Sequence, residues 1–280
     1  MEKIEADKEK EELPVLKSRA VFIPVVIAVA LVPLITIIHI YDCGLEENAW
    51  FSTGGKLYDF FLYYKAFLLR IIGIAVLFIL SYIISFYDRK YLNRMAVAPL
   101  IALGIFCLGT FLSAILSDHR TSSFFGGYEQ FEGWFVILSY IVCFYLVYGY
   151  ARTLDIVRFI MNALLIGAAI VGILGTFQAF GLDWIQSTPA KYILTPELIG
   201  QIDIDKFNIT LNFGSGTSYV TLYNPNYVGS YVSLALPYCI YMAIKKDKLW
   251  RRITAAVTSL LLVITLVASG SLAGILGLVI

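Results

Sequence analysis

Long apolar segments dominate this chain and limit what it can fold into. Crossing the hydrocarbon core of a bilayer takes about 20 helical residues. Seven runs of roughly that length occur, at 20–41, 66–87, 95–117, 133–150, 156–180, 226–244 and 252–268. Hydrophobic residues make up 59% of the 280 residues and charged residues only 15%, a larger apolar share than a soluble core needs. The sequence therefore predicts an all-α fold, a polytopic membrane helix bundle.

The two ends of the chain differ in polarity. Residues 1–19, MEKIEADKEKEELPVLKSR, lack the compact basic region and small-residue cleavage site of a secretory signal, so the first apolar run is expected to stay in the protein. We interpret 1–19 as a cytoplasmic tail and 20–280 as a membrane domain of about seven spans. The chain ends on SLAGILGLVI, about half a span, which predicts a truncated eighth span that continues beyond residue 280.

Lysine and arginine residues set the expected orientation, because they are enriched in cytoplasmic connections. With the N-terminus in the cytoplasm, the inner segments hold 15 of these residues and the outer segments hold 5. Arg70 lies near the outer end of the second run, where its side chain can reach the interface. We therefore predict a plasma-membrane protein whose long connections, 42–65, 118–132 and 181–225, lie outside.

Two of the outer connections carry recognisable patterns. The first ends in DFFLYYK, whose aromatic rings are expected at headgroup level beside Asp59 and Lys65, as an interfacial belt. In 181–225, KFNITLNF alternates apolar and polar residues with the period of a strand, and GSG at 214–216 is a turn signal. We predict an external loop with a β-hairpin at 181–225.

The segment TLYNPNYVGSYV, at 221–232, places two asparagines at the mouth of an apolar helix. Asn224 is a good N-cap, and Pro225 suits the first helical position. Asn226 is then expected in the first turn, where unpaired backbone N–H groups and the helix dipole attract anions such as phosphate. Two interpretations stay open: a capped, tightly packed helix without a ligand, or a binding site in which Asn224 and Asn226 contact a phosphate-bearing substrate.

Two further polar groups are predicted at the same side of the membrane. Glu129 and Glu132 open the fourth run, either to complement its helix dipole or to form a cluster with His119 and Arg120. Ser269 and Ser271 flank Gly270 at the end of the seventh run, either as a simple helix–helix turn or as part of a substrate site.

The ionisable residues exclude some classes of protein. Ion-coupled pumps usually carry carboxylates at mid-membrane, and the apolar runs hold none; their few ionisable residues lie near the run ends, with His39 and Arg70 near the expected outer boundary. The four cysteines form no CxxC pair and the chain has only two histidines, so we expect no metal site. These patterns favour binding or chemistry at the outer leaflet over transport.

Four segments occur in an order and spacing that resembles the O-antigen ligase/polymerase-like membrane family. They are YEQFEGWFVILSY, GTFQAFGLDW, GTSYVTLYNPNYVGSYVSLALP and SGSLAGILGL, and the resemblance spans about 115–280. DFFLYYK also resembles relatives from Gram-positive bacteria. The resemblance implies an all-α membrane body of the kind grouped with C-type glycosyltransferases. It implies transfer of a glycan from an undecaprenyl-pyrophosphate carrier to a glycan, lipid or protein acceptor, with no cofactor, no metal and no nucleic acid.

The resemblance also directs attention to individual residues. It implies that Asn224, Asn226, Ser269 and Ser271 bind substrate. Glu132 is the candidate catalytic base, and Arg120 is the candidate cation. Family members often carry arginine where this chain has Gln130 and Leu272, and the expectation is that further basic groups follow residue 280.

Two alternatives to a glycan ligase or polymerase stay open. The first is a permease or flippase for lipid-linked sugars, which would need a substrate path and polar residues at the inner face. The second is a non-catalytic membrane partner in cell-envelope polymer assembly, which the missing arginines would allow.

Overall fold

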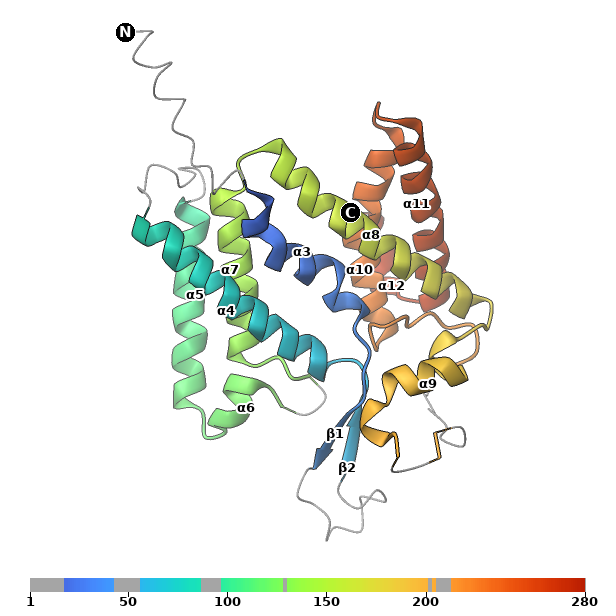
Figure 1. Ribbon diagram of the computed structural model, residues 1–280, viewed down its shortest axis with the longest axis horizontal. Coiled ribbons are helices and arrows are strands. Elements are labelled where there is room, and N and C mark those ends of the chain that lie inside the picture. Colours follow the sequence, from blue (N-terminus) through green and yellow to red (C-terminus); the bar gives the residue numbers. More distant parts are fainter. Residues whose placement is uncertain are drawn as a thin grey trace. The chain divides into compact units, whose positions relative to one another are not determined.

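The computed structural model describes residues 18–42, 56–86, 97–127, 130–200, 203–204 and 213–279 (Figure 1). Ten α-helices lie in these residues, α3 to α12, together with four short 3₁₀ helices and two strands. Five of the helices are long and apolar enough to cross a membrane: α4 (Tyr63–Phe86), α5 (Val97–Leu116), α8 (Leu154–Ala179), α10 (Pro225–Ile244) and α11 (Leu249–Ser269). The chain is a mostly helical, multi-pass membrane protein.

The remaining elements are shorter. The apolar stretch Arg19–Leu34 consists of η1 (Arg19–Phe22), α3 (Ile23–Ala30) and η2 (Val32–Leu34), and α7 spans Trp134–Tyr150. The polar connections contain α6 (Arg120–Phe125), η5 (Trp184–Gln186), α9 (Thr188–Leu194) and η6 (Pro196–Leu198). The last helix, α12 (Leu272–Val279), coincides with the predicted half span.

The first predicted span differs most from the structure. We expected one helix over 20–41, but helical structure ends at Leu34 and the chain continues into the strand β1 (His39–Asp42). Pro33 lies inside this region and has no N–H to donate, which accounts for the break between α3 and η2. The β-branched residues that follow, ITII at 35–38, favour extended backbone over helix.

A two-stranded sheet was not predicted. β1 pairs antiparallel with β2 (Lys56–Asp59), and His39 lies opposite Asp59 in this register. The first arm of the β-hairpin that we predicted within 181–225, KFNITLNF, falls largely on 205–212, which lies outside the described residues. Its second arm, TSYVTLY at 217–223, is described and forms a loop without a strand. The turn signal at 214–216 is confirmed, since the N–H of Thr217 donates to the carbonyl of Gly214.

The structure divides into two compact units. Unit 1 comprises residues 1–29 and 66–163, and unit 2 comprises residues 30–65 and 164–280, so that the boundary falls within α3 and α8 and just after Lys65.

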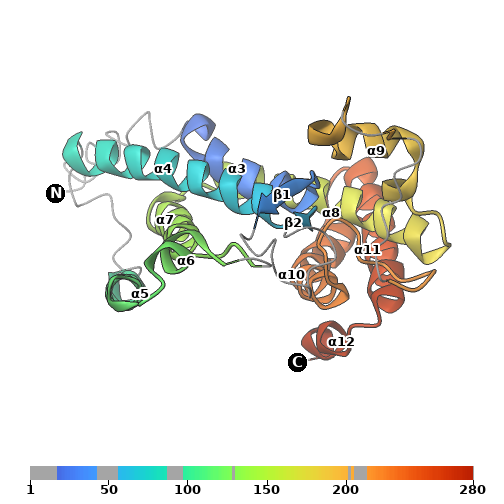
Figure 2. The same ribbon diagram turned by 90° about the horizontal axis from the view of Figure 1, so that it is seen from below.

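Unit 2 is built on close contacts between helices that carry small residues. α10 lies beside both α11 and α12 (Figures 1 and 2). A Cβ added at Gly274 of α12 would lie only 2.5 Å from the Cα of Gly229 in α10. One at Gly175 of α8 would lie 2.9 Å from the Cβ of Thr265 in α11. Glycine therefore permits the backbone approach on which this packing depends.

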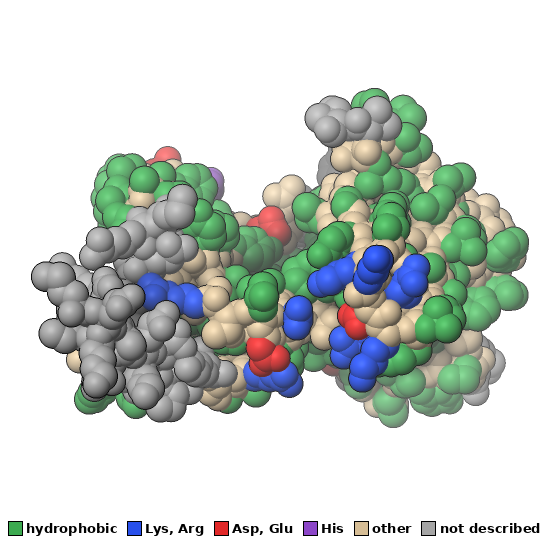
Figure 3. All heavy atoms as spheres, turned by 90° about the horizontal axis from the view of Figure 1, so that it is seen from above, with side chains coloured by type: hydrophobic (Ala, Val, Ile, Leu, Met, Phe, Trp, Pro, Cys, Tyr) green, Lys and Arg blue, Asp and Glu red, His purple; other side chains and the backbone are tan. Residues whose placement is uncertain are grey.

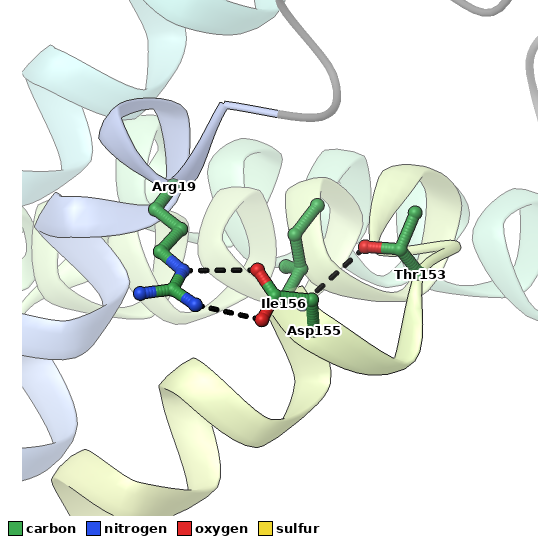
Figure 4. A network of polar contacts seen from close by, with 4 residues as sticks. All are labelled: Arg19, Thr153, Asp155 and Ile156. Carbon is green, nitrogen blue, oxygen red and sulfur yellow. Dashed lines mark hydrogen bonds and ion pairs between the residues drawn. The ribbon is translucent and has the colours of Figure 1, made fainter.

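Unit 1 relies more on aromatic rings and surface polar contacts. Phe111 of α5 packs against Phe124 of α6 and Trp134 of α7, with ring centroids 4.8 to 6.0 Å apart. Two nitrogens of Arg19 donate to the carboxylate of Asp155, at 2.9 and 2.7 Å. They form a bidentate ion pair at the start of α8 (Figure 4). The hydroxyl of Thr153 caps the same helix by accepting from the N–H of Ile156 at 3.3 Å (Figure 4).

Candidate functional site

Polar structure gathers at one end of unit 2. The loop 213–224 is tied to the end of α11, because the N–H of Ser218 donates to Ala268 at 3.2 Å, and to the end of α8, because the hydroxyl of Ser218 donates to Gly175 at 2.6 Å. The residue just before β1 is tied to α9, because the N–H of Ile38 donates to the carbonyl of Leu194 at 2.7 Å. We call this region the polar end of unit 2: residues 39–42 and 56–65, residues 181–200, the loop 213–224 and the first turns of α10 and α12.

The other end of α10 and α11 is basic. The turn that joins the two helices exposes Lys and Arg side chains around one acidic residue (Figure 3): Lys245, Lys246, Asp247, Lys248, Arg251 and Arg252. The pKa of Asp247 is lowered, first by the backbone N–H of Lys248 and then by Arg251, which pairs with it at 3.4 Å. Since α10 has 20 residues, about 30 Å of helix separates this turn from the polar end.

The cap at the predicted helix mouth is confirmed, but the unpaired backbone N–H groups that we expected there are not present: Pro225 has no N–H, and the N–H groups of the next three residues all donate to Asn224. α10 begins at Pro225, and the side chain of Asn224 accepts from the N–H of Asn226 at 2.8 Å. The side chain of Asn226 is exposed in the first turn. Just before the cap, Val220 and Tyr223 adopt positive φ angles of 53° and 71°, which is uncommon for residues other than glycine. The backbone that leads into α10 is therefore held in a specific, strained shape.

Ser269 and Ser271 lie at the turn between α11 and α12. Both are buried, and their hydroxyls are engaged: Ser269 donates to the carbonyl of Leu266 at 2.7 Å, and Ser271 accepts from the N–H of Gly274 at 3.1 Å. Ser271 also contacts the position of a Cβ at Gly229. The structure gives both serines a capping role, and a role in substrate binding stays a prediction.

Lys65 is a residue of this region whose importance the sequence did not reveal. It is buried at the start of α4, and its ammonium donates to the carbonyl of Thr221, three residues before Asn224. Thr221 is anchored on its other side, since its hydroxyl donates to Pro33 at 2.7 Å. Asp59 caps α4 by accepting from the N–H groups of Leu62 and Tyr63, each at 2.9 Å. We expected DFFLYYK to form an interfacial belt. In the structure, its Lys65 supports the loop before α10.

His39 lies in an aromatic and acidic setting at the same end. Its ring stacks on Tyr63 with centroids 3.4 Å apart and meets the edge of Tyr64 at 6.0 Å. Partial burial lowers the pKa of His39, against the opposing effect of Glu197 and Asp59. A neutral imidazole can accept a proton. Sequence reasoning noted His39 only as an ionisable residue near a boundary, because its neighbours come from distant parts of the chain.

The two predicted catalytic residues belong to unit 1. Arg120 begins α6 and lines an open cavity of about 560 Å³ with Asp118 and His119. Glu132 precedes α7, whose N-cap is Gly133, and its carboxylate accepts from the hydroxyl of Tyr140 at 3.1 Å. No ion pair joins Arg120 to Glu132 in the part of the chain that the structure describes, and Glu129 lies outside that part. A catalytic role for either residue stays a prediction.

A buried network joins α8 to the loop 213–224. The side-chain oxygen of Gln178 accepts from the N–H groups of Tyr219 and Val220, at 3.1 and 2.7 Å, and its amide donates to Asp183 at 3.1 Å. Asp183 also accepts from the hydroxyl of Tyr219 and from the N–H of Ile185. Burial raises the pKa of the Tyr219 hydroxyl, and its bond to Asp183 adds to this effect.

Comparisons with known proteins add no identification. The chain matches no protein-family model, no curated protein and no solved structure. Among the described residues, no three His, Cys, Asp or Glu side chains come close enough to hold a metal ion. The chemistry open to the site therefore depends on its own groups: an exposed asparagine at a capped helix N-terminus, a histidine with a lowered pKa, and a polar loop held by buried hydrogen bonds.

Proposed function

We propose that this chain is a glycan ligase or polymerase of the bacterial plasma membrane. It takes a glycan from an undecaprenyl-pyrophosphate carrier and joins it to a glycan, lipid or protein acceptor at the outer face, with its N-terminus in the cytoplasm. The observation that carries the proposal is the exposed Asn226 at the mouth of α10, about 30 Å of helix away from a basic turn. The excess of Lys and Arg on that turn supports a cytoplasmic location for it and an outer location for the polar end.

The chemistry requires few groups. The acceptor hydroxyl attacks the anomeric carbon, a new glycosidic bond forms, the bond from that carbon to phosphate breaks, and the carrier pyrophosphate leaves with the bonding electrons. A base must take the hydroxyl proton, and donors must face the departing phosphates. In unit 2, His39, whose pKa is lowered by burial, is a candidate base, and the exposed side-chain amide of Asn226 is the donor at the mouth of α10. In unit 1, Glu132 and Arg120 stay the candidate base and cation.

Binding of the carrier is the direct test of the first step. The chain is reconstituted in lipid nanodiscs, and its affinity for undecaprenyl pyrophosphate is compared with that for uncharged undecaprenol. We expect preference for the pyrophosphate and a loss of about 2- to 10-fold in Asn226→Ala, the loss of one hydrogen bond. Ser230→Ala is the matched control, because Ser230 is exposed one turn further along the same helix.

Transfer is tested separately with carrier-linked glycans and labelled acceptors. Release of undecaprenyl pyrophosphate together with a lengthened acceptor would support the proposal. Equal affinity for the carrier and for undecaprenol would contradict it at the binding step. Carrier binding without transfer across several glycans and acceptors would instead favour a non-catalytic partner in envelope-polymer assembly.

A further inference from the structure

A polar cavity of about 270 Å³ opens beside the network around Gln178. Its walls come from the end of α8, from η5 and from the tight turn at 214–217. The polar side chains that line it are Gln178, Asp183, Gln186, Ser215 and Thr217, with Phe213 and Tyr219 as aromatic neighbours. None of these residues contributes to the helix mouth of α10, so the cavity is a second feature of the polar end.

The walls are rigid but keep unused hydrogen-bonding capacity. Gln178 is 2% exposed, and its bonds to the backbone of residues 219 and 220 and to Asp183 fix its position. A carboxamide nitrogen carries two N–H groups, so Gln178 keeps one. The hydroxyls of Ser215 and Thr217 and the amide of Gln186 add both donors and acceptors. The cavity therefore combines one fixed carboxamide with further donors and acceptors on its more exposed walls.

The charged groups of the lining disfavour both anions and cations as ligands. None of the described lining residues is basic, so the cavity offers no counter-ion to a phosphate or a carboxylate. Asp183, the only carboxylate among the described lining residues, already accepts from three donors: the amide of Gln178, the hydroxyl of Tyr219 and the N–H of Ile185. These bonds use both oxygens of the carboxylate, so it has few acceptor positions left for a ligand. The lining therefore fits a neutral ligand better than a charged one.

The aromatic residues of the lining narrow the class of neutral ligand further. Phe213 and Tyr219 stack with centroids 4.5 Å apart and 24° between their planes. An apolar ring surface beside convergent donors and acceptors is the arrangement that binds a molecule with one apolar and one polar side. A pyranose sugar has this character, with C–H groups on its faces and hydroxyls around its edge.

We propose that this cavity binds one neutral sugar residue. The biological role of this site rests on the proposed function. In that function, the sugar belongs to the glycan of the donor or of the acceptor. The binding itself is a separate property of the chain. The side chains of Gln186 and Thr217 would hydrogen-bond the hydroxyls, and Phe213 would contact a C–H face.

The test measures binding of methyl glycosides to the whole chain in detergent by saturation-transfer NMR. The panel contains neutral hexoses, N-acetylhexosamines and a hexuronic acid. We expect at least one neutral glycoside to bind, and the uronic acid to bind more weakly because of its charge. Gln186→Ala and Thr217→Val should each weaken binding about 2- to 10-fold, the loss of one hydrogen bond. Both changes spare the Gln178 network, so the fold is expected to survive.

Matched controls come from unit 1. Gln130→Ala and Thr121→Val make the same substitutions at exposed positions that do not line the cavity, and binding should be unchanged. Absence of binding by every glycoside, or equal losses in cavity and control variants, would overturn the proposal. The carrier-binding and transfer assays test the proposed function separately. Sugar binding without carrier binding would support the sugar site and contradict the proposed function.

Discussion

Two helices of equal length show how the two units differ. α5 of unit 1 and α10 of unit 2 each have 20 residues and each qualify as membrane spans. In the apolar window of α5 only 11% of the residues are buried, against 39% in α10. The glycines explain part of this difference. A Cβ at Gly104 or Gly109 of α5 would meet nothing within 4 Å, whereas one at Gly229 of α10 would contact Ser271. Apolar composition places a helix in a membrane, and small residues in register decide whether it packs against protein.

The polar contacts differ in the same way. In unit 1 the ion pair between Arg19 and Asp155 lies at the surface, with the two side chains 58% and 59% exposed. In unit 2 the bonds of Gln178 to the loop backbone are buried. A surface ion pair contributes little to stability, whereas a buried donor that loses its acceptor is costly. Unit 2 therefore holds its polar end in one shape, which is what a binding site requires.

The largest expected effect concerns orientation, because it is all or none. In a Cys43→Ser background, Ser215→Cys should react with a membrane-impermeant thiol reagent in intact cells, and Lys246→Cys should react only after the cells are opened. Both positions are exposed, so accessibility depends on the side of the membrane. Labelling of position 246 alone would reverse the topology and remove the proposed outer location of the polar end.

The next effect concerns stability. Gln178→Leu leaves the buried N–H groups of Tyr219 and Val220 without an acceptor and should lower the free energy of unfolding by about 2–4 kcal/mol. Tyr140→Phe removes one exposed hydrogen bond in unit 1 and should change it by about 1 kcal/mol or less. Denaturant unfolding in detergent measures both variants. Similar losses in the free energy of unfolding of the two variants would contradict the proposed difference between the units.

A third comparison uses glycine. Gly274→Ala places a methyl group against the backbone of Gly229 and should destabilise the chain by about 1–3 kcal/mol. Gly104→Ala meets open space within a helix and should be neutral or stabilise by up to about 1 kcal/mol. Thermal melting in one detergent compares the two variants. A stable Gly274→Ala protein would show that α10 and α12 do not pack as described.

The smallest effect is a dependence on pH. Burial lowers the pKa of His39 in the folded protein, so the unfolded chain binds a proton more readily. Its contribution to stability is therefore complete above the unfolded pKa of about 6.5 and is lost as the pH falls below that value. The melting temperature should fall less between pH 7.5 and 5.5 in His39→Gln than in wild type. His119→Gln changes the exposed second histidine and should follow wild type, and identical curves for all three proteins would contradict the account.

Five of the seven predicted runs form helices long enough to cross a membrane, because a run of about 20 apolar residues has few alternatives there. The helices in the runs at 20–41 and 133–150 are shorter. The capping of α10 by Asn224 was also predictable, since a cap depends only on neighbours in the sequence. The first run was predicted wrongly at its end, where Pro33 and β-branched residues outweigh hydropathy. The contacts of Lys65 with Thr221 and of His39 with Tyr63 could not be predicted, because they join residues far apart in the chain.

The most direct test of the central claim maps where the carrier pyrophosphate binds. A polyprenyl pyrophosphate with a small photoreactive group beside its phosphates is irradiated with the reconstituted chain, and labelled peptides are identified by mass spectrometry. The account predicts label in residues 213–230, at the loop and first turn of α10, and its loss on competition with undecaprenyl pyrophosphate. Label that is confined to residues 97–150 of unit 1 and is lost on competition with undecaprenyl pyrophosphate would contradict the assignment of the site to the polar end of unit 2.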